Sequence, residues 1–536
     1  MNPYTFDAVK PVVETKYGAL RGVCYGGVNM FMGVKYADAP RFQLPREPQP
    51  WEGVKNAYVY GPISPQMGGP SPFPFYRGLL LLQKEGEDCQ NLNIWAPKEQ
   101  SGGKKPVFVW IHGGGFMAGN AMEEYSFDGF HMAREGDVVF VSINHRLNIL
   151  GYMNLTEYGE AFAESPNLGL WDLVAALKWI HENIAAFGGD PDNVTICGHS
   201  GGGGKVLCLY QMPEAASYFH RGICLSGATP QGPASEPEDT RALAREMLAQ
   251  LDIGPENISE VYTVPFNRLV WAYRQVAMRL YNEGRYVIFE PQPTDKFIGF
   301  PPFHGFAACS AQKPLILSTV LGEFAMCPVK AEEKSAMSEA DKIAFLRRSF
   351  GENADELIAR FRRSYPDHDL MDLTCTDTVF RRPTAEAALE KARCGADNTY
   401  VYLAALNTLE DGNPPLWHGG DVGYAFKNED RVFVLNDPVY GPVMSDIFSS
   451  VLLSFAKTGD PNNPYLPEWK PFTEAEPWTM VIDKACELRM DKDTQSGKNI
   501  PFDEPFMDLM MRCVPPFRLP PMFAEEGMNA QIQMDS

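Results

Sequence analysis

The sequence predicts an α/β protein built on a large, mostly parallel central sheet flanked by helices. Six short, continuous apolar runs alternate with helix-like segments, and such runs are typical of strands buried on both faces of a parallel sheet. The 536-residue chain is 45% hydrophobic and 21% charged, so it can form a large core and lacks the composition of a disordered protein. The predicted strands are 106–112, 137–143, 193–198, 222–227, 314–320 and 400–406.

Two helices are predicted between these strands. Residues 168–187 carry apolar side chains at helical spacing and are ended by the "GGDPDN" turn, and residues 205–219 can also form a helix. The stretches 68–78 and 298–306 are rich in Pro and aromatic residues and are predicted as long loops over the sheet. We expect most of 228–300 to be loop with helical pieces.

Net charge excludes several classes of partner. The formal charge is -21, whereas nucleic acids and anionic membranes require clustered Lys and Arg. We therefore expect a small-molecule substrate and no nucleic acid. The first residues lack the basic and apolar regions of a Sec signal, and no run approaches bilayer length, so a soluble, cytoplasmic protein without stable membrane insertion is predicted.

The segment "DNVTICGHSGGGGKVLCLY" places a serine between a strand-like run and a helix-like run. Gly198-His199-Ser200-Gly201-Gly202 matches G-X-S-X-G, the nucleophile elbow, in which glycines allow a strained turn close to its neighbours. A plain glycine-rich turn is the alternative. A phosphate-binding loop is rejected, because counting back from Lys205 puts His199 where its first glycine should be. The sequence does not explain why Gly203 and Gly204 are also glycines.

A nucleophilic serine requires donors for the oxyanion that it creates. The segment "WIHGGGFMAGN" (110–120) is a strand ending in His-Gly-Gly-Gly, which can turn bare backbone N–H groups toward a carbonyl oxygen. Alone it would be only a tight turn. Upstream of an elbow, it is predicted to form the oxyanion loop.

The serine also requires a base. In this architecture the order is serine, acid, histidine, and only four of the nine histidines follow Ser200. His418 is favoured because it lies in a glycine-flanked loop beyond the last predicted strand. The others are better explained as structural histidines; they are His220, His304 and His368.

Two residues compete for the role of the acid. Glu323 follows a buried strand directly, where parallel-sheet enzymes place active residues. Asp421 is the rival close to His418 in the chain. Glu323 is favoured.

With these residues, the chain resembles the type-B carboxylesterase/lipase family, the cholinesterase-like branch of the α/β-hydrolases, from about Val12 to about Asp503. The resemblance implies the α/β-hydrolase fold, and we expect one domain over 1–536 with a helical and loop insertion at about 228–310. The matching segments are "EDCQNLNIWAP" (87–97), "WIHGGGF" (110–116), "NHRLNILGY" (144–152), "NLGLWDLVAALKWIHENIAAFGGDPDNVTICG" (167–198), "LILSTVLGEF" (315–324), "WHGGDVGYAF" (417–426) and "SFAKTGDPNNP" (454–464).

The family resemblance implies ester hydrolysis through an acyl-enzyme, without a metal or cofactor. It implies Ser200 as nucleophile, His418 as base and Glu323 as orienting acid. The oxyanion hole would use the backbone N–H groups of three glycines, Gly114, Gly115 and Gly201.

The chain departs from the family beside the serine. The family usually has Glu and Ala there, where this chain has His199 and Gly201. A backbone donor survives the second change, so the departure affects the shape of the site and leaves the mechanism in place. The "GHSGGGGK" form resembles a bacterial subgroup of the family, and its closest resemblance is to bacterial carboxylesterases.

Two other functions remain open. The family includes inactive, cholinesterase-like binding proteins, although these typically lose the serine. A lipase acting on longer acyl esters is the second alternative, with 73–84 as an interfacial lid or, in the favoured interpretation, a gorge wall. The sequence leaves open the natural ester, its acyl-chain length, and whether the protein is a monomer or a homo-oligomer.

The resemblance also suggests two finer properties. Secreted relatives close a loop with a disulfide at the position of Cys89, but this chain offers Met67 in the upstream region, so Cys89 is predicted to be a free thiol. Cholinesterases bind the quaternary ammonium on a tryptophan before this cysteine, and residues 52–94 contain none. We therefore expect uncharged esters of short or medium acyl length and poor turnover of choline esters.

Overall fold

The computed structural model describes residues 5–67, 84–99, 102–228, 235–299, 305–324, 327–409 and 412–490. A twelve-stranded sheet lies at its centre, and three further strands, β2, β3 and β6, form a small separate sheet. The strands are β1 (Phe6–Asp7), β2 (Val12–Thr15), β3 (Gly18–Arg21), β4 (Val23–Tyr25), β5 (Val28–Lys35), β6 (Val54–Asn56), β7 (Asn91–Pro97), β8 (Lys105–Ile111), β9 (Val139–Ile143), β10 (Gly189–His199), β11 (Arg221–Leu225), β12 (Leu315–Val320), β13 (Thr399–Ala404), β14 (Trp478–Ile482) and β15 (Glu487–Met490).

The large sheet has the order β1-β4-β5-β7-β9-β8-β10-β11-β12-β13-β14-β15. Its central pairs, from β9 to β14, are parallel, and the pairs at both ends are antiparallel. All six runs predicted as strands lie in the parallel part. The predicted α/β-hydrolase fold with a mostly parallel central sheet is therefore confirmed.

Helices cover both faces of the sheet. The α-helices are α2 (Phe130–Gly136), α3 (Asn148–Tyr152), α4 (Leu168–Asn183), α5 (Gly201–Leu209), α6 (Pro237–Ala249), α7 (Phe266–Asn282), α8 (Ala331–Ala336), α9 (Glu339–Phe350), α10 (Ala354–Ser364), α11 (Arg381–Ala392), α12 (Gly420–Ala425) and α13 (Gly441–Thr458). Short 3-10 helices are η1 (Tyr125–Phe127), η2 (Thr156–Tyr158), η3 (Glu160–Phe162), η4 (Ser165–Asn167), η5 (Ile184–Phe187), η6 (Pro255–Tyr262), η7 (Gly351–Asn353), η8 (Leu370–Cys375) and η9 (Glu429–Arg431).

Strand β8 shows why its apolar run is continuous. Its alternate side chains enter two different cores: Val107, Val109 and Ile111 pack with α4 and α5, whereas Phe108 and Trp110 pack with α2 and α13. A strand covered on both faces has no solvent side, so polar residues have no place in it.

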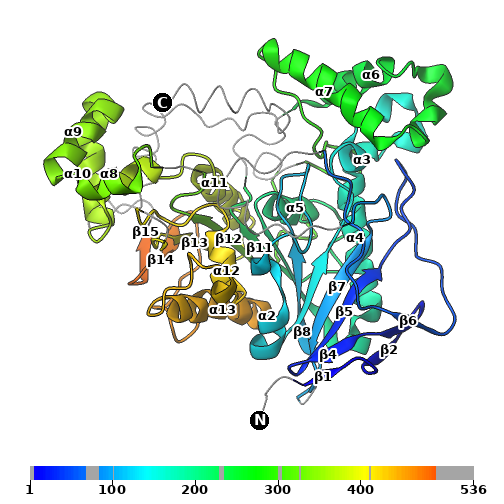
Figure 1. Cartoon of the computed structure of the whole chain (residues 1–536), viewed down its shortest axis with the longest axis horizontal. Coiled ribbons are helices and arrows are strands. Elements are labelled where there is room, and N and C mark those ends of the chain that lie inside the picture. Colours follow the sequence, from blue (N-terminus) through cyan, green and yellow to red (C-terminus); the bar gives the residue numbers. More distant parts are fainter. Residues whose placement is uncertain are drawn as a thin grey trace.

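Helical segments lie outside the sheet at both ends of the view in Figure 1. Helices α6 and α7 pack together between β11 and β12 in the chain, within the predicted insertion at 228–310. Helices α8, α9 and α10 form a second group at the opposite end, with the sheet between the two groups (Figure 1). The whole of the predicted loop at 68–78 lies outside the described residues, as do residues 73–83 of the predicted lid or gorge wall and residues 300–304, including His304.

One predicted helix differs in extent. The sequence predicts a helix over 205–219, but α5 begins earlier, at Gly201, and ends at Leu209. Pro213 follows in a series of turns, and proline has no N–H to continue a helix. The ten cysteines among the described residues, Cys89 included, are free thiols.

Candidate active site

Ser200 lies in the turn between β10 and α5. Its backbone has φ 57° and ψ -128°, a conformation that L-residues rarely adopt. Two glycines make the turn possible, because a Cβ on Gly198 would lie 2.3 Å from the carbonyl carbon of Gly202, and one on Gly202 would lie 2.1 Å from the Ile111 oxygen. The strand, strained serine and helix are the geometry of a nucleophile elbow.

The structure explains Gly203, which the sequence did not. A Cβ on Gly203 would lie 3.0 Å from the Cα of Gly227, and one on Gly227 would lie 2.5 Å from the Cα of Gly203. Helix α5 thus packs with its backbone directly on the loop after β11. Gly204 is less constrained, since its added Cβ would lie 3.3 Å from the Gly227 oxygen.

The segment 112–118, named here the glycine loop, follows β8 and passes beside Ser200. A Cβ on Gly113 would lie 3.3 Å from the Ser200 Cβ. Gly114 and Gly115 have φ of 83° and 62°, values that favour glycine. The Gly114 carbonyl accepts hydrogen bonds from the N–H groups of Met117 and Ala118, at 3.2 and 3.0 Å. Because a trans peptide directs N–H and C=O oppositely, the Gly115 N–H points away from those donors.

The Gly114 N–H belongs to the same peptide group as the Gly113 carbonyl, and a hydrogen bond to that carbonyl fixes its orientation. Nδ1 of His112 lies 2.9 Å from the Gly113 oxygen, and since a carbonyl can only accept, this nitrogen carries the proton. Gly201 is the first residue of α5, so its N–H has no acceptor within the helix. A Cβ on Gly201 would lie 2.2 Å from the Gly115 oxygen, so the helix start and the glycine loop are in close contact.

His418 and Glu323 are bonded to each other. Nδ1 of His418 lies 2.5 Å from the carboxylate oxygen Oε2 of Glu323. The backbone N–H of His418 also donates a hydrogen bond to the backbone carbonyl oxygen of Glu323, at 2.9 Å. The other carboxylate oxygen of Glu323 accepts from the Ser226 hydroxyl at 2.6 Å and from the Val320 N–H at 2.9 Å. The carboxylate is therefore fixed by the ends of β11 and β12.

Burial affects both members of this pair. Desolvation lowers the pKa of His418, since the imidazolium would lose its water, so the ring is neutral and able to accept a proton. Desolvation raises the pKa of Glu323, and the hydrogen bonds from Ser226 and Val320 act in the opposite direction. The hydrogen bond between the two side chains is short enough to stabilise the charged pair when the ring takes a proton.

Three rings surround His418. The ring of Phe380 stacks on it at 4.8 Å between centroids, and that of Phe324 lies at 4.2 Å. The third is His199, at 4.3 Å, whose next residue is Ser200. The structure therefore brings the predicted base against the residue adjoining the predicted nucleophile.

The rival candidates have other partners. Asp421 lies on α12 and accepts a hydrogen bond from the Tyr402 hydroxyl at 2.9 Å. His220 Nδ1 accepts from the Val194 N–H at 3.0 Å, and His368 lies 2.8 Å from a carboxylate oxygen of Asp483.

Sequence reasoning missed two residues of this region. Ser226 supports Glu323, but nothing in "GICLSG" marks a serine that will contact a residue 97 positions later. Lys205 contacts the glycine loop, and it was considered only as part of a phosphate-binding motif. The described residues contain no group of three or more His, Cys, Asp or Glu side chains placed to hold a metal ion.

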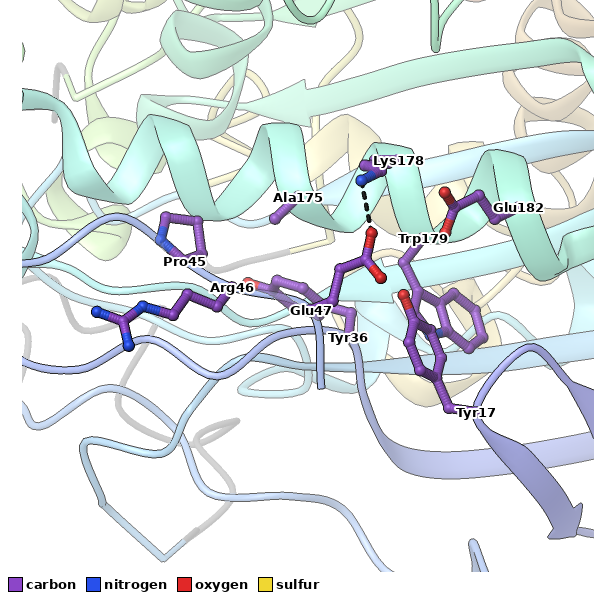
Figure 2. A pocket seen from close by; sticks show the side chains of 9 residues that line it. All are labelled: Tyr17, Tyr36, Pro45, Arg46, Glu47, Ala175, Lys178, Trp179 and Glu182. Carbon is purple, nitrogen blue, oxygen red and sulfur yellow. Dashed lines mark hydrogen bonds and ion pairs between the residues drawn. The ribbon is translucent and has the colours of Figure 1, made fainter. Parts of the chain in front are cut away.

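A small surface pocket lies elsewhere, between α4 and the N-terminal part of the chain. Figure 2 shows Lys178 of α4 joined to Glu47 across it, an ion pair of 2.7 Å. It contains none of the six candidate residues. Its lining residues are Tyr17, Tyr36, Pro45, Arg46, Glu47, Ala175, Lys178, Trp179 and Glu182.

Residues 9–499 match the model of the Carboxylesterase family. The chain belongs to this family. The match confirms the predicted resemblance and identifies the protein as an enzyme, a hydrolase of carboxylic esters. The family acts on small ester substrates.

Individual relatives agree along nearly the whole chain. The chain is 31% identical over 498 residues to para-nitrobenzyl esterase of Bacillus subtilis (strain 168), covering 91% of this chain and 97% of that protein. It is 30% identical to phenmedipham hydrolase of Pseudarthrobacter oxydans, covering 90% and 97%. A solved esterase from anaerobic Clostridium hathewayi, which can hydrolyze aliphatic aromatic polyesters, is 39% identical with a TM-score of 0.87, covering 95% of this chain and 99% of that chain.

Proposed function

We propose that this carboxylesterase works through an acyl-enzyme on Ser200, with His418 as base and Glu323 as the acid that orients and balances it. The N–H groups of Gly114, Gly115 and Gly201 form the oxyanion hole. The observation that carries the proposal is the 2.5 Å contact between His418 and Glu323, with the ring of His418 packed beside the strained turn that presents Ser200.

Acylation begins when the Ser200 hydroxyl attacks the ester carbonyl and His418 takes its proton at Nε2. The carbonyl oxygen becomes an oxyanion, which accepts hydrogen bonds from the three glycine N–H groups. The Glu323 carboxylate accepts a hydrogen bond from Nδ1–H of the imidazolium and balances its charge. The intermediate then collapses, His418 returns the proton to the alkoxide, and the alcohol leaves.

Deacylation repeats these steps with water. His418 removes a proton from water, the hydroxide adds to the acyl carbonyl, and the same N–H groups hold the second oxyanion. Collapse transfers the proton to Ser200 and releases the carboxylic acid. Glycine at 114 and 115 suits this role, because it adopts the required φ with no side chain over the donors.

We propose uncharged esters of short or medium acyl chain as substrates. The rings of Phe324 and Phe380 beside His418 favour an apolar group near the scissile bond. The relatives named above act on a para-nitrobenzyl ester and on aliphatic aromatic polyesters, which are uncharged. A lipase acting on longer acyl chains remains the alternative, and an inactive binding protein is disfavoured because serine, base, acid and donors are all present.

Several wider properties belong to the same proposal. We propose that 1–536 acts as one catalytic domain, in the cytoplasm, without a nucleic-acid partner or insertion in a membrane. None of the described helices combines the length and apolar character needed to cross a bilayer. The net charge of -21 and the free cysteines support the proposal. Eleven titratable thiols in freshly purified protein under denaturing, non-reducing conditions are expected, and a smaller number would argue against it.

The test is hydrolysis of p-nitrophenyl esters from acetate to palmitate by wild type, Ser200→Ala and a control, Ser335→Ala, on the exposed face of α8. We expect the rate to be greatest for short or medium chains, to be abolished in Ser200→Ala and to be unchanged in Ser335→Ala. A maximum at palmitate would favour the lipase. Butyrylcholine cleaved faster than p-nitrophenyl butyrate would overturn the substrate proposal, and active Ser200→Ala would overturn the mechanism.

A further inference from the structure

Lys205 is a fully buried lysine on α5, one turn after Ser200. Its Nζ donates a hydrogen bond to the Gly115 carbonyl at 2.8 Å and lies 3.4 Å from the His112 carbonyl. These carbonyls belong to the two ends of the stretch that carries Gly114 and Gly115. The side chain therefore links these two carbonyls of the glycine loop.

Burying a lysine is unfavourable unless its polar atom is satisfied. Among the residues that the structure describes, no carboxylate lies within ion-pair distance of Lys205, so its close partners are these backbone carbonyls. Burial lowers the pKa of Lys205 to about 7, and the charges of Cys208 and Glu123 act in the opposite direction. The ring of Phe116 lies 5.5 Å from Nζ and adds a cation–π contact. A buried cation held only in this way is costly in stability, which points to a role other than filling the core.

The glycine loop has every carbonyl from Gly113 to Gly115 occupied. His112 Nδ1 holds the first, the N–H groups of Met117 and Ala118 hold the second, and Lys205 holds the third. The first two contacts lie within the loop itself. Lys205 is the one that ties the loop to α5, the helix that begins immediately after the nucleophile.

We propose that Lys205 is a positioning residue that clamps the glycine loop onto α5, so that the oxyanion donors and Ser200 keep one fixed geometry. The inference rests on the function proposed above. The glycine and lysine positions then have a common explanation: Gly201 and Gly202 let the loop approach the helix, and Lys205 holds it there.

A core-packing role predicts a different outcome. If only the alkyl stem of Lys205 mattered, methionine would replace it, since methionine fills similar space without a donor or a charge. If Lys205 positions the glycine loop, Lys205→Met should weaken stabilisation of the transition state and leave binding of the ester unchanged. Lys205→Arg keeps both donor and charge and should restore part of the rate.

The experiment measures kcat and KM for p-nitrophenyl butyrate, and inhibition by a trifluoromethyl ketone, which forms a tetrahedral adduct with a serine. For Lys205→Met we expect kcat to fall between about 10-fold and 100-fold, with KM nearly unchanged. Inhibition by the ketone should weaken by the same factor as kcat/KM. Lys205→Arg should retain more activity than Lys205→Met.

The matched control is Lys391→Met, which removes another fully buried lysine, on α11, whose Nζ bonds the Asn398 side chain at 3.2 Å. It should leave kcat, KM and ketone inhibition unchanged. Thermal melting of every variant identifies misfolding, and if Lys205→Met does not fold, Lys205→Gln is compared with Lys205→Arg for the same pattern.

Wild-type kcat and ketone inhibition in a folded Lys205→Met would overturn the proposal. An equal loss of kcat and Tm in the arginine and methionine variants would do so too, because it would indicate packing alone. Ser200→Ala separates this failure from failure of the proposed function: activity in that variant refutes the mechanism, whatever Lys205 does.

Discussion

Glu323 and His418 are joined twice, once through their side chains and once through their backbones. The side-chain contact is 2.5 Å, and the His418 N–H donates to the Glu323 oxygen at 2.9 Å. The backbone hydrogen bond fixes the distance between two residues that lie 95 positions apart in the chain. The carboxylate and the ring therefore lose little conformational entropy when their side chains come together. The base is therefore positioned by the segment that follows the carboxyl end of β12, an interior strand of the sheet.

This relationship predicts unequal effects for the two rival acids. Glu323→Gln should lower kcat by about 10⁴-fold while the protein stays folded, because an amide cannot balance the imidazolium and can hold the wrong tautomer. Asp421→Asn should cost far less, since Asp421 bonds the Tyr402 hydroxyl. Both variants are measured with one activated ester and by thermal melting. A nearly wild-type Glu323→Gln beside a folded, inactive Asp421→Asn would reverse the assignment.

The pH dependence of kcat/KM should reflect the lowered pKa of the buried His418. The sequence alone predicts an acid limb with an apparent pKa of about 6 to 7, near that of free histidine. Since burial lowers the pKa of His418, the ring stays neutral at lower pH, and the loss of kcat/KM on acidification should have its midpoint below 6.5. A pH profile of kcat/KM, with circular dichroism to exclude unfolding, checks this. A midpoint above 6.5 would contradict it.

The glycines after the serine should differ in their tolerance of alanine. Gly203→Ala puts a methyl group 3.0 Å from backbone of the neighbouring loop and should destabilise the protein by about 1–3 kcal/mol. Gly204→Ala meets its nearest atom at 3.3 Å and adds helix propensity worth up to about 1 kcal/mol, so it should be near neutral. Urea unfolding of both variants decides. Equal destabilisation would show that packing on Gly227 does not set the requirement.

Cys327 should be the most reactive thiol of the native protein. A hydrogen bond from the Cys375 thiol is the main cause that lowers the pKa of Cys327, which favours its thiolate form. Cys394 is the control, because it is also partly exposed but burial raises its pKa. Peptide mapping after brief iodoacetamide treatment at pH 7 should show Cys327 modified first, and more slowly in Cys375→Ala. Equal labelling of Cys327 and Cys394 would contradict this.

Much of the fold could be predicted, because the central strands have a recognisable pattern of continuous apolar residues. Strand β8 was predicted at 106–112 and lies at Lys105–Ile111, since burial on both faces requires an unbroken apolar run. Nine of the fifteen described strands were not predicted, among them β1, β2 and β4. These three have two to four residues, and each contains exposed residues, so their sequences carry no clear period.

The sequence predicted the residues of the site that lie in recognisable motifs, but it did not predict their tertiary contacts. The glycine motifs around Ser200 and Gly114 are visible because strained turns restrict which residues fit. The partnership of Ser226 with Glu323 arises only when β11 and β12 pair, and the burial of Lys205 depends on how closely the glycine loop approaches α5. Such contacts are set by tertiary packing, which one sequence does not display.

The central claim is that Ser200 carries the acyl group, and rapid-quench mass spectrometry of p-nitrophenyl butyrate turnover tests it most directly. Wild-type enzyme should release a burst of nitrophenol equal to the active sites, with the butyryl group on the peptide containing Ser200. Ser200→Ala should show neither burst nor adduct. A burst that persists in Ser200→Ala, or a butyryl group on another residue, would contradict the account.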